Sequence, residues 1–247
     1  MKYEGMIAET VRLNGHEGDQ IDAYLARPLG AGPVGGVVLI HYMVGWDTAI
    51  KEMTRKLAYN GFATIAPNMH FRASKATSQE NSASVRESGG MPDDRSMGDV
   101  QGAMQYLRNL PYVNGKVGLI GFCIGGRLTY LGACTLDNVD AAVDCWGGGV
   151  TRVNGEPTPA RPRSPIELTE GLNCPLLGLF GDDDDRPSPA DVAETEAELK
   201  RLNKNFEFHT YPGAGHNFFI VDRPSYRQEA ATDGWEKVIG FFGQHLR

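Results

Sequence analysis

One cysteine of this chain stands where the local sequence could make its thiol a nucleophile. Cys123 lies in the segment Gly-Phe-Cys-Ile-Gly-Gly, which begins at Gly121 and follows the apolar run 117–120. A helix-compatible segment, 124–136, comes directly after it. At the start of a helix, free backbone N–H groups and the helix dipole stabilise both a thiolate and an oxyanion. We therefore expect a sharp strand-to-helix turn with Cys123 at its apex.

Two other interpretations of the cysteine stay open. A cysteine is often only a small buried hydrophobic residue, and the chain would then be a non-catalytic binder of small molecules. The spacing Gly121-x-Cys123-x-x-Gly126 also nearly matches the dinucleotide motif G-x-G-x-x-G, with the acidic Asp144 about 20 residues further on. That motif needs glycine at its second position, where the backbone approaches a pyrophosphate. A dinucleotide-dependent oxidoreductase is therefore an alternative that Cys123 disfavours, and we expect no cofactor.

Two later segments supply an acid and a base. Four acidic residues, 182–185, follow the apolar segment 175–180, and His216 follows the alternating segment 206–211 within Gly-Ala-Gly-His-Asn. An acidic run is often only a solvated turn, and a histidine among glycines can be an ordinary turn residue. The order nucleophile, acid, histidine is nevertheless that of hydrolases with a G-x-S-x-G elbow. Because parallel strands end at the same sheet edge, we expect the three groups to form a catalytic triad.

The composition is that of an ordinary globular protein of 247 residues with a formal net charge of −7. The negative charge argues against nucleic acid or an anionic membrane as a partner, and no apolar run approaches the roughly 20 residues needed to span a bilayer. The first residues contain no apolar stretch of a signal peptide, and the four cysteines lack both C-x-x-C spacing and the density of a disulfide scaffold. We therefore expect a cytoplasmic protein, whose surroundings would keep a catalytic thiol reduced.

The elements that must position these residues alternate along the chain. We expect strands at 7–13, 20–27, 35–41, 62–66, 117–120, 141–146, 175–180 and 206–211, and helices at 47–59, 96–110, 124–136, 190–202 and 226–242. The first two strands form an antiparallel hairpin. The rest predicts one α/β domain over 1–247, with a mostly parallel central sheet and helices on both faces. Segment 71–93 shows no periodicity, and its position after a strand suggests a flap over the active site.

Three motifs together resemble the dienelactone hydrolase (carboxymethylenebutenolidase) family of the α/β-hydrolase superfamily. They are Gly-Phe-Cys123-Ile-Gly-Gly, Gly-Leu-Phe-Gly-Asp-Asp-Asp184-Asp-Arg-Pro-Ser-Pro and Gly-Ala-Gly-His216-Asn-Phe-Phe. The resemblance covers residues 7–242, essentially the whole chain. A cysteine in the elbow sets this family apart from most serine esterases.

The resemblance implies a role for each site residue. Cys123 would be the nucleophile, His216 the base and Asp184, third after the glycine of its loop, the acid that orients His216. The N–H groups of Ile124 and Met43 would form the oxyanion hole. The implied activity is hydrolysis of a small carboxylic ester or lactone through an acyl-thioester, with neither a metal nor an organic cofactor. An acyltransferase that uses the same triad is the main alternative.

The chain departs from the family around the substrate. Family members carry a glutamate where this chain has Tyr42, and they hold a substrate carboxylate with arginines where it has Ile220 and Asn81. Arg86 or Arg72, both in the expected flap, is a candidate replacement. Tyr42 is neutral at pH 7, and we expect it to lie near the thiol and donate a hydrogen bond to sulfur.

The expected substrate-binding residues complete the candidate site. They are Tyr42, Trp146, Asn217 and Arg86. The expected partner is a small ester or lactone, and the protein is expected to be a monomer or a homodimer. The sequence leaves the natural substrate open.

Overall fold

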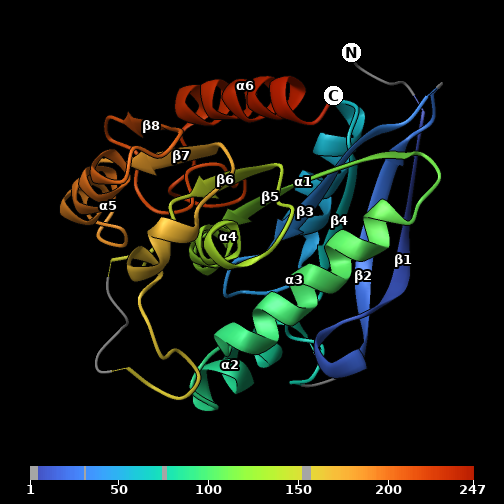
Figure 1. The fold of residues 1–247 in the computed structure, drawn as a ribbon, viewed down its shortest axis with the longest axis horizontal. Coiled ribbons are helices and arrows are strands. Elements are labelled where there is room, and N and C mark those ends of the chain that lie inside the picture. The colour runs from blue at the N-terminus through green and yellow to red at the C-terminus, as the bar shows by residue number, and fades with distance from the viewer. Residues whose placement is uncertain (1–4, 31, 74–76, 152–156) are drawn as a thin grey trace.

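The eight strands form one twisted sheet with helices packed on both of its faces (Figure 1). The computed structural model describes residues 5–30, 32–73, 77–151 and 157–247. The strand order is β1-β2-β4-β3-β5-β6-β7-β8. The strands are β1 (Met6–Asn14), β2 (Gln20–Pro28), β3 (Val34–Ile40), β4 (Ala63–Pro67), β5 (Val113–Phe122), β6 (Ala141–Cys145), β7 (Leu176–Gly181) and β8 (Phe206–Tyr211).

Strand direction follows the expected pattern. β1 pairs antiparallel with β2, and β2 antiparallel with β4, while the pairs from β4 through β8 are parallel. The predicted α/β class with an N-terminal hairpin is therefore confirmed. The parallel strands consequently end at one edge of the sheet, which is where the three candidate catalytic segments begin.

The helices divide between the two faces according to which side chains they bury. They are α1 (Thr48–Tyr59), α2 (Ser78–Glu87), α3 (Asp93–Arg108), α4 (Ile124–Thr135), α5 (Pro189–Arg201) and α6 (Gln228–His245), with short 3-10 turns η1 (His16–Gly18) and η2 (Pro165–Gly171). Within β3, Val37 packs with α1 and α6 in one core cluster, whereas Val38 packs with α3 and α4 in another. This alternation is what a strand buried on both faces requires.

The expected elements are present, and the largest difference in a strand boundary is at the start of β5. It begins at Val113 rather than at residue 117, because Val113 pairs with Val34 across a register shift. The residues between, 114–116, are exposed and give no apolar signal. The hydrophobic pattern alone therefore could not detect residues 113–116 as part of this strand.

Segment 71–93 contains a helix that the sequence analysis did not expect. Thr77 and Glu80 form a reciprocal capping box at the start of α2, and the buried residues of this helix are Ser82 and Val85. So narrow a buried face leaves no helical periodicity to detect. The Thr-x-x-Glu pattern was the one available signal. After α2 the chain turns through Gly89 and Gly90, both at positive φ.

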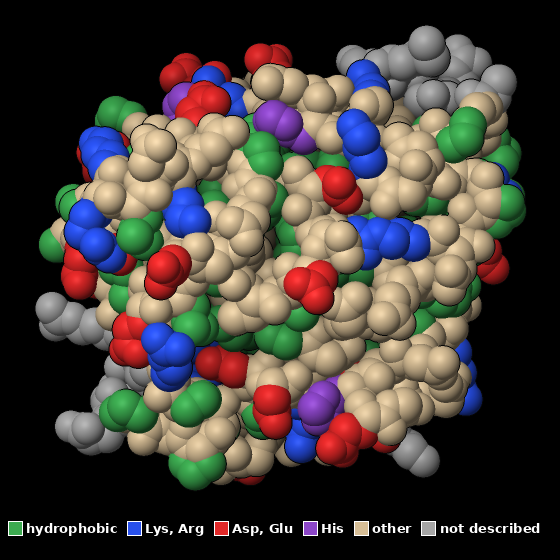
Figure 2. Space-filling model, in the orientation of Figure 1, with side chains coloured by type: hydrophobic (Ala, Val, Ile, Leu, Met, Phe, Trp, Pro, Cys, Tyr) green, Lys and Arg blue, Asp and Glu red, His purple; other side chains and the backbone are tan. Residues whose placement is uncertain are grey.

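No helix in the described part of the chain combines the length and the apolar character that a membrane span requires. On the face shown in Figure 2, acidic and basic side chains are interspersed rather than gathered into one large region of a single sign.

Candidate active site

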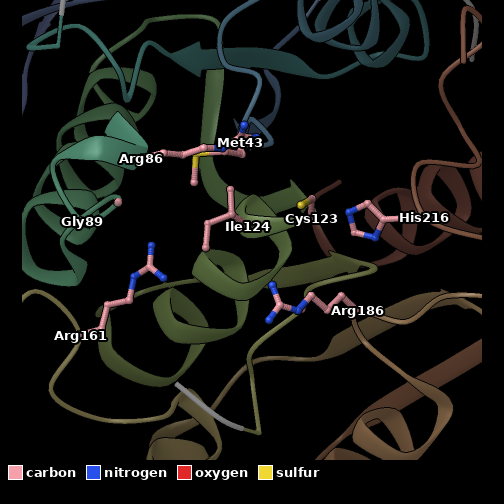
Figure 3. Close-up of a pocket in the computed structure, with 10 residues that line it drawn as sticks. Met43, Arg86, Gly89, Cys123, Ile124, Arg161, Arg186 and His216 are labelled. Atoms are coloured by element: carbon pink, nitrogen blue, oxygen red, sulfur yellow. The ribbon is translucent and has the colours of Figure 1, made fainter. Parts of the chain in front are cut away.

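Cys123 occupies the predicted turn between β5 and α4. Its backbone has φ 57° and ψ −120°, and it is the N-cap residue of α4. Non-glycine residues rarely adopt positive φ, and such strain persists only where the surrounding structure enforces it. Here the Cys123 N–H donates to the carbonyl of Cys145 at the end of β6, at 3.0 Å. The thiol is thus held at the apex of the turn, in the cavity shown in Figure 3.

The glycines around Cys123 are explained by close backbone packing. A Cβ on Gly121 would lie 2.0 Å from the carbonyl oxygen of Gly125, and a Cβ on Gly125 would lie 2.2 Å from that of Ile40. A Cβ on Gly126 would lie 2.3 Å from a carboxylate oxygen of Asp144. The turn therefore fits against β3 and β6 only without these side chains, and the glycine spacing has a cause other than a bound dinucleotide.

The loops after β7 and β8 bring an acid to the histidine. His216 Nδ1 lies 2.8 Å from Asp184 Oδ2, and the other Asp184 oxygen accepts the Arg186 N–H at 2.8 Å. Asp184 is buried, whereas Asp182, Asp183 and Asp185 are exposed. Of the four consecutive acids, the structure thus pairs Asp184 with His216, as the family resemblance implied.

His216 is held in its protonated form. Burial by itself would lower its pKa, but the hydrogen bond with Asp184 and the neighbouring Cys123 sulfur outweigh burial and raise the pKa to about 10. At neutral pH the ring is therefore an imidazolium beside the Cys123 sulfur.

Cys123 and His216 share a cavity of about 500 Å³ with Met43 and Ile124 (Figure 3). The N–H groups of Met43 and Ile124 donate no hydrogen bond to another described residue. Both are therefore free to bind an oxygen that develops negative charge beside the thiol. Their role in an oxyanion hole stays a prediction.

Three arginines give the cavity a positive charge. Arg86 comes from α2, Arg161 from the segment before η2 and Arg186 from the loop after β7. In the view of Figure 3, Arg86 and Arg161 lie beyond Ile124 from His216, and Arg186 lies on the His216 side. None of the described residues that line the cavity is acidic.

None of these three arginines forms an ion pair within the described residues. Arg161 is partly buried, and burial lowers its pKa, as does the neighbouring cation Arg127, while Asp93 raises it. Its Nε donates to the Met91 carbonyl at 3.4 Å. The guanidinium charges thus remain available to an anionic ligand.

Arg86 was among the predicted substrate-binding residues, whereas Arg161 and Arg186 were not. Arg186 could have been suspected, because it lies two residues after Asp184 in the acid loop. Arg161 lies in a Pro- and Arg-rich stretch whose composition is that of irregular surface, and nothing local distinguishes it from Arg163. Tertiary packing alone brings it to the cavity.

The predicted hydrogen bond from the Tyr42 hydroxyl to the Cys123 sulfur is not present. The Tyr42 hydroxyl donates instead to Asp47 Oδ2 at 2.6 Å. The other Asp47 oxygen caps α1 by accepting the Ile50 N–H. Burial and then this carboxylate raise the pKa of Tyr42. The hydroxyl is therefore committed to the start of α1, and Tyr42 is not among the residues that line the cavity.

Trp146 and Asn217 also lie outside the cavity lining. Trp146 is fully buried and packs against Phe218, with ring centroids 4.7 Å apart. Its ring centroid lies 6.5 Å from that of His216, so it supports the histidine from the core. Asn217 adopts a positive φ in the turn that follows His216. These two residues shape the histidine loop.

Asp144 is a buried carboxyl group close to the elbow. One of its oxygens accepts the Gly147 N–H at 2.8 Å, and burial raises its pKa from 3.8 to about 7. Because the native pKa lies above the unfolded value, the native state favours the protonated group. Its stabilising contribution is complete below about pH 4 and is lost as the pH rises through about 7.

Replacing Asp144 by asparagine should therefore raise stability at neutral pH. The amide oxygen can still accept the Gly147 N–H, and no charge has to be buried. We expect the free energy of unfolding of Asp144→Asn to exceed that of the wild type at pH 8 by up to about 4 kcal/mol, with the difference vanishing near pH 4. Urea unfolding across this range measures it, and Asp137→Asn on the exposed surface is the control. A difference independent of pH would contradict a protonated Asp144.

Comparison with known proteins agrees with the geometry. The sequence profile described as the dienelactone hydrolase family matches residues 21–246. A Synechocystis protein with the provisional name carboxymethylenebutenolidase is 33% identical over 234 residues, which cover 92% of this chain and 93% of that protein. A Bradyrhizobium protein with the provisional name 2-oxo-3-(5-oxofuran-2-ylidene)propanoate lactonase is 28% identical, with 98% of each chain covered.

A solved structure shows the same fold. A protein from Klebsiella pneumoniae, provisionally named dienelactone hydrolase, superposes with a TM-score of 0.88 at 30% identity. The match covers 98% of this chain and 100% of that chain. The range that the profile matches contains the elbow, the acid loop and the histidine loop. The chain thus belongs to the dienelactone hydrolase family of α/β-hydrolases, whose members are hydrolases of carboxylic esters and lactones.

Proposed function

We propose that Cys123, His216 and Asp184 hydrolyse a small ester or lactone through an acyl-thioester on Cys123. One observation carries this proposal. The thiol lies at a strained strand-to-helix apex and in one cavity with His216, which Asp184 holds at 2.8 Å. A nucleophile, a proton carrier and a group that fixes the orientation of the carrier are the minimal parts of covalent acyl transfer.

In the acylation step the thiolate attacks the carbonyl carbon of the substrate. The carbonyl oxygen becomes an oxyanion and accepts hydrogen bonds from the Met43 and Ile124 N–H groups, each contributing roughly 3–4 kcal/mol in comparable sites. When the carbon–oxygen bond of the ester breaks, protonated His216 gives its proton to the leaving oxygen. Asp184 keeps Nδ1 engaged, so that Nε2 faces the reacting atoms.

In the deacylation step water attacks the acyl-thioester. Neutral His216 takes a proton from the water, and the same two N–H groups bind the second oxyanion. Collapse of this intermediate releases the carboxylic acid and restores the thiolate beside the imidazolium. Every proton in this cycle is carried by His216, the substrate or water.

The three arginines indicate an anionic substrate. A cavity of about 500 Å³ accepts a small molecule, and guanidinium groups bind carboxylates with two parallel hydrogen bonds. The Bradyrhizobium relative is named for a lactone that carries a carboxylate. We therefore propose a small ester or lactone with a carboxylate group, and segment 71–93, which supplies Arg86, as part of the cover that selects it. All four cysteines are free, as a reducing cytoplasm would keep them.

Arg161→Gln should separate recognition from chemistry. We expect KM for an anionic ester to rise about 10- to 100-fold, because a hydrogen bond to a charged group contributes roughly 1.5–3 kcal/mol. A neutral ester with the same leaving group should be unaffected. Steady-state kinetics on the two esters measure the change in KM. Arg163 pairs with Glu167 on the surface, so Arg163→Gln is the control. Equal losses for both esters would remove Arg161 from substrate binding.

The acyl-thioester is tested by quenching the reaction in acid within the first turnover. Mass spectrometry should find the acyl group on the peptide that contains Cys123. Adding an alcohol or amine tests the acyltransferase alternative. If the product is an amide or new ester at the expense of acid, even when the added nucleophile is dilute, the enzyme is a transferase.

A further inference from the structure

The peptide group that joins Tyr42 to Met43 has two functions at once. Its carbonyl belongs to Tyr42, its N–H to Met43, and the peptide is trans. In a planar trans peptide the C=O and N–H bonds point in opposite directions. Whatever fixes the Tyr42 oxygen therefore also fixes the direction of the Met43 N–H, which the proposed function assigns to the oxyanion hole.

Two donors hold the Tyr42 oxygen. The His41 ring nitrogen Nδ1 lies 2.7 Å from it, and the Gly45 N–H donates to it at 3.0 Å. The second bond closes a tight turn over residues 42–45, which sets only the local shape of the loop. The His41 bond instead connects this peptide to a rigid, buried side chain, because His41 is fully buried directly after β3 ends at Ile40.

His41 is itself fixed by the loop after β4. The Met69 N–H donates to His41 Nε2 at 3.1 Å, so Nε2 is an acceptor and the proton sits on Nδ1, where it is donated to Tyr42. Burial lowers the pKa of His41 to about 4, although the hydrogen bond to Tyr42 opposes this shift. The ring packs edge-on against His70, with centroids 4.7 Å apart. One tautomer in one orientation is thus enforced from both sides.

We infer that His41 is a positioning residue of the oxyanion hole: its Nδ1–H holds the Tyr42 carbonyl so that the Met43 N–H of the same peptide points into the cavity. This inference rests on the proposed function, in which Met43 binds the oxyanion. His41 is not among the residues that line the cavity, so it acts only through the peptide. A hydrogen bond accepted by the carbonyl also polarises the peptide and strengthens its N–H as a donor.

The test compares two reactions of the same thiol. Acylation by an ester builds an oxyanion, whereas alkylation by iodoacetamide displaces iodide from carbon and builds none. Removing the support of the oxyanion hole should therefore slow acylation without slowing alkylation. A general distortion of the elbow or of His216 would slow both.

His41→Leu removes the donor and the acceptor while nearly preserving volume. We expect the single-turnover acylation rate to fall about 100-fold, in the range seen for loss of one oxyanion donor, while the rate of Cys123 alkylation stays within about twofold, since no oxyanion donor contributes to it. His41→Gln can donate to the Tyr42 oxygen and accept from the Met69 N–H, and it should recover most of the acylation rate. If the leucine variant does not fold, His41→Met, whose flexible side chain fills irregular space, takes its place.

His70→Leu is the matched control. His70 lies against His41 in the same buried corner, and neither of its ring nitrogens has a hydrogen-bond partner among the described residues. Its replacement disturbs packing there but leaves the Tyr42 peptide held. The ratio of acylation to alkylation should remain that of the wild type.

Three results would overturn the inference. They are an unchanged acylation rate in folded His41→Leu or His41→Met, equal losses of acylation and alkylation, and a His41→Gln variant as slow as leucine. Failure of the proposed function looks different, because alkylation of wild-type Cys123 would then leave hydrolysis intact.

Discussion

Replacing Cys123 by alanine should abolish hydrolysis, lowering kcat by about 10⁵- to 10⁶-fold, the loss seen when a triad nucleophile is removed. Alanine keeps the Cβ and the backbone N–H, so the strained turn and the hydrogen bond from this N–H to the Cys145 carbonyl should survive. Only the sulfur is lost, and water alone cannot form the acyl intermediate. Steady-state kinetics with an activated ester, combined with circular dichroism to confirm folding, measure the effect.

The other three cysteines provide the controls for this change. Burial raises the pKa of Cys134 and of Cys174 to about 12 and that of Cys145 well above its ordinary value. Such thiols stay protonated and unreactive. Cys134→Ala, Cys145→Ala and Cys174→Ala should therefore keep the chemical step nearly intact. Substantial activity in Cys123→Ala would refute the proposed mechanism.

Asp184→Asn should lower kcat by about 10⁴-fold with little change in fold, as in other triads that lose this charge. The amide can still accept the Arg186 N–H, but its NH₂ group can face His216 Nδ1 and reverse the tautomer. The carboxylate is also one of the groups that raise the pKa of His216 to about 10. Without it the pKa falls, and a smaller fraction of His216 carries the proton that the leaving oxygen needs.

The same kinetics on variants of the neighbouring acidic residues test whether Asp184, rather than another acid of this loop, is the catalytic one. Asp183→Asn and Asp185→Asn change exposed side chains and should be mild. Asp182→Asn touches a turn, because Asp182 Oδ1 accepts the Gly213 N–H at 2.7 Å, and it should affect stability more than kcat. A larger loss of kcat in the variant at 183 or 185 than in the variant at 184 would show that Asp184 is not the catalytic acid.

The parts of the site that could be predicted from the sequence are those whose geometry is local. Gly121, Gly125 and Gly126 mark the elbow by their spacing, although the atoms that exclude a Cβ there belong to the elbow itself, to β3 and to β6. Asp184 and His216 follow strands, so strand prediction places them at one sheet edge. The acid loop alone left four equivalent carboxylates, and the burial that distinguishes Asp184 is a tertiary property.

The substrate side of the cavity could not be predicted in this way. Arg161 reaches the cavity because residues 157–164 fold back over Gly90 and Met91, about 70 positions away along the chain. The Tyr42 hydroxyl was assigned to sulfur, but Asp47, which caps the next helix, lies within its reach. Helix α2 escaped detection because two buried residues do not make a periodic face. Of these three outcomes, only the position of Arg161 depends on a contact between segments far apart in the sequence.

The origin of the three arginines has a consequence for how such an enzyme changes over evolutionary time. The proposed catalytic groups follow the ends of buried strands, whereas Arg86 and Arg161 stand on connecting segments that tolerate insertion and exchange. Arg186 differs, because its backbone N–H holds Asp184 while its side chain faces the cavity. A lineage could therefore exchange α2 or the segment 157–164 and acquire a new acid, ester or lactone as substrate. At position 186 it could alter only the side chain, since shortening that loop would remove a hydrogen bond from the acid that orients the histidine.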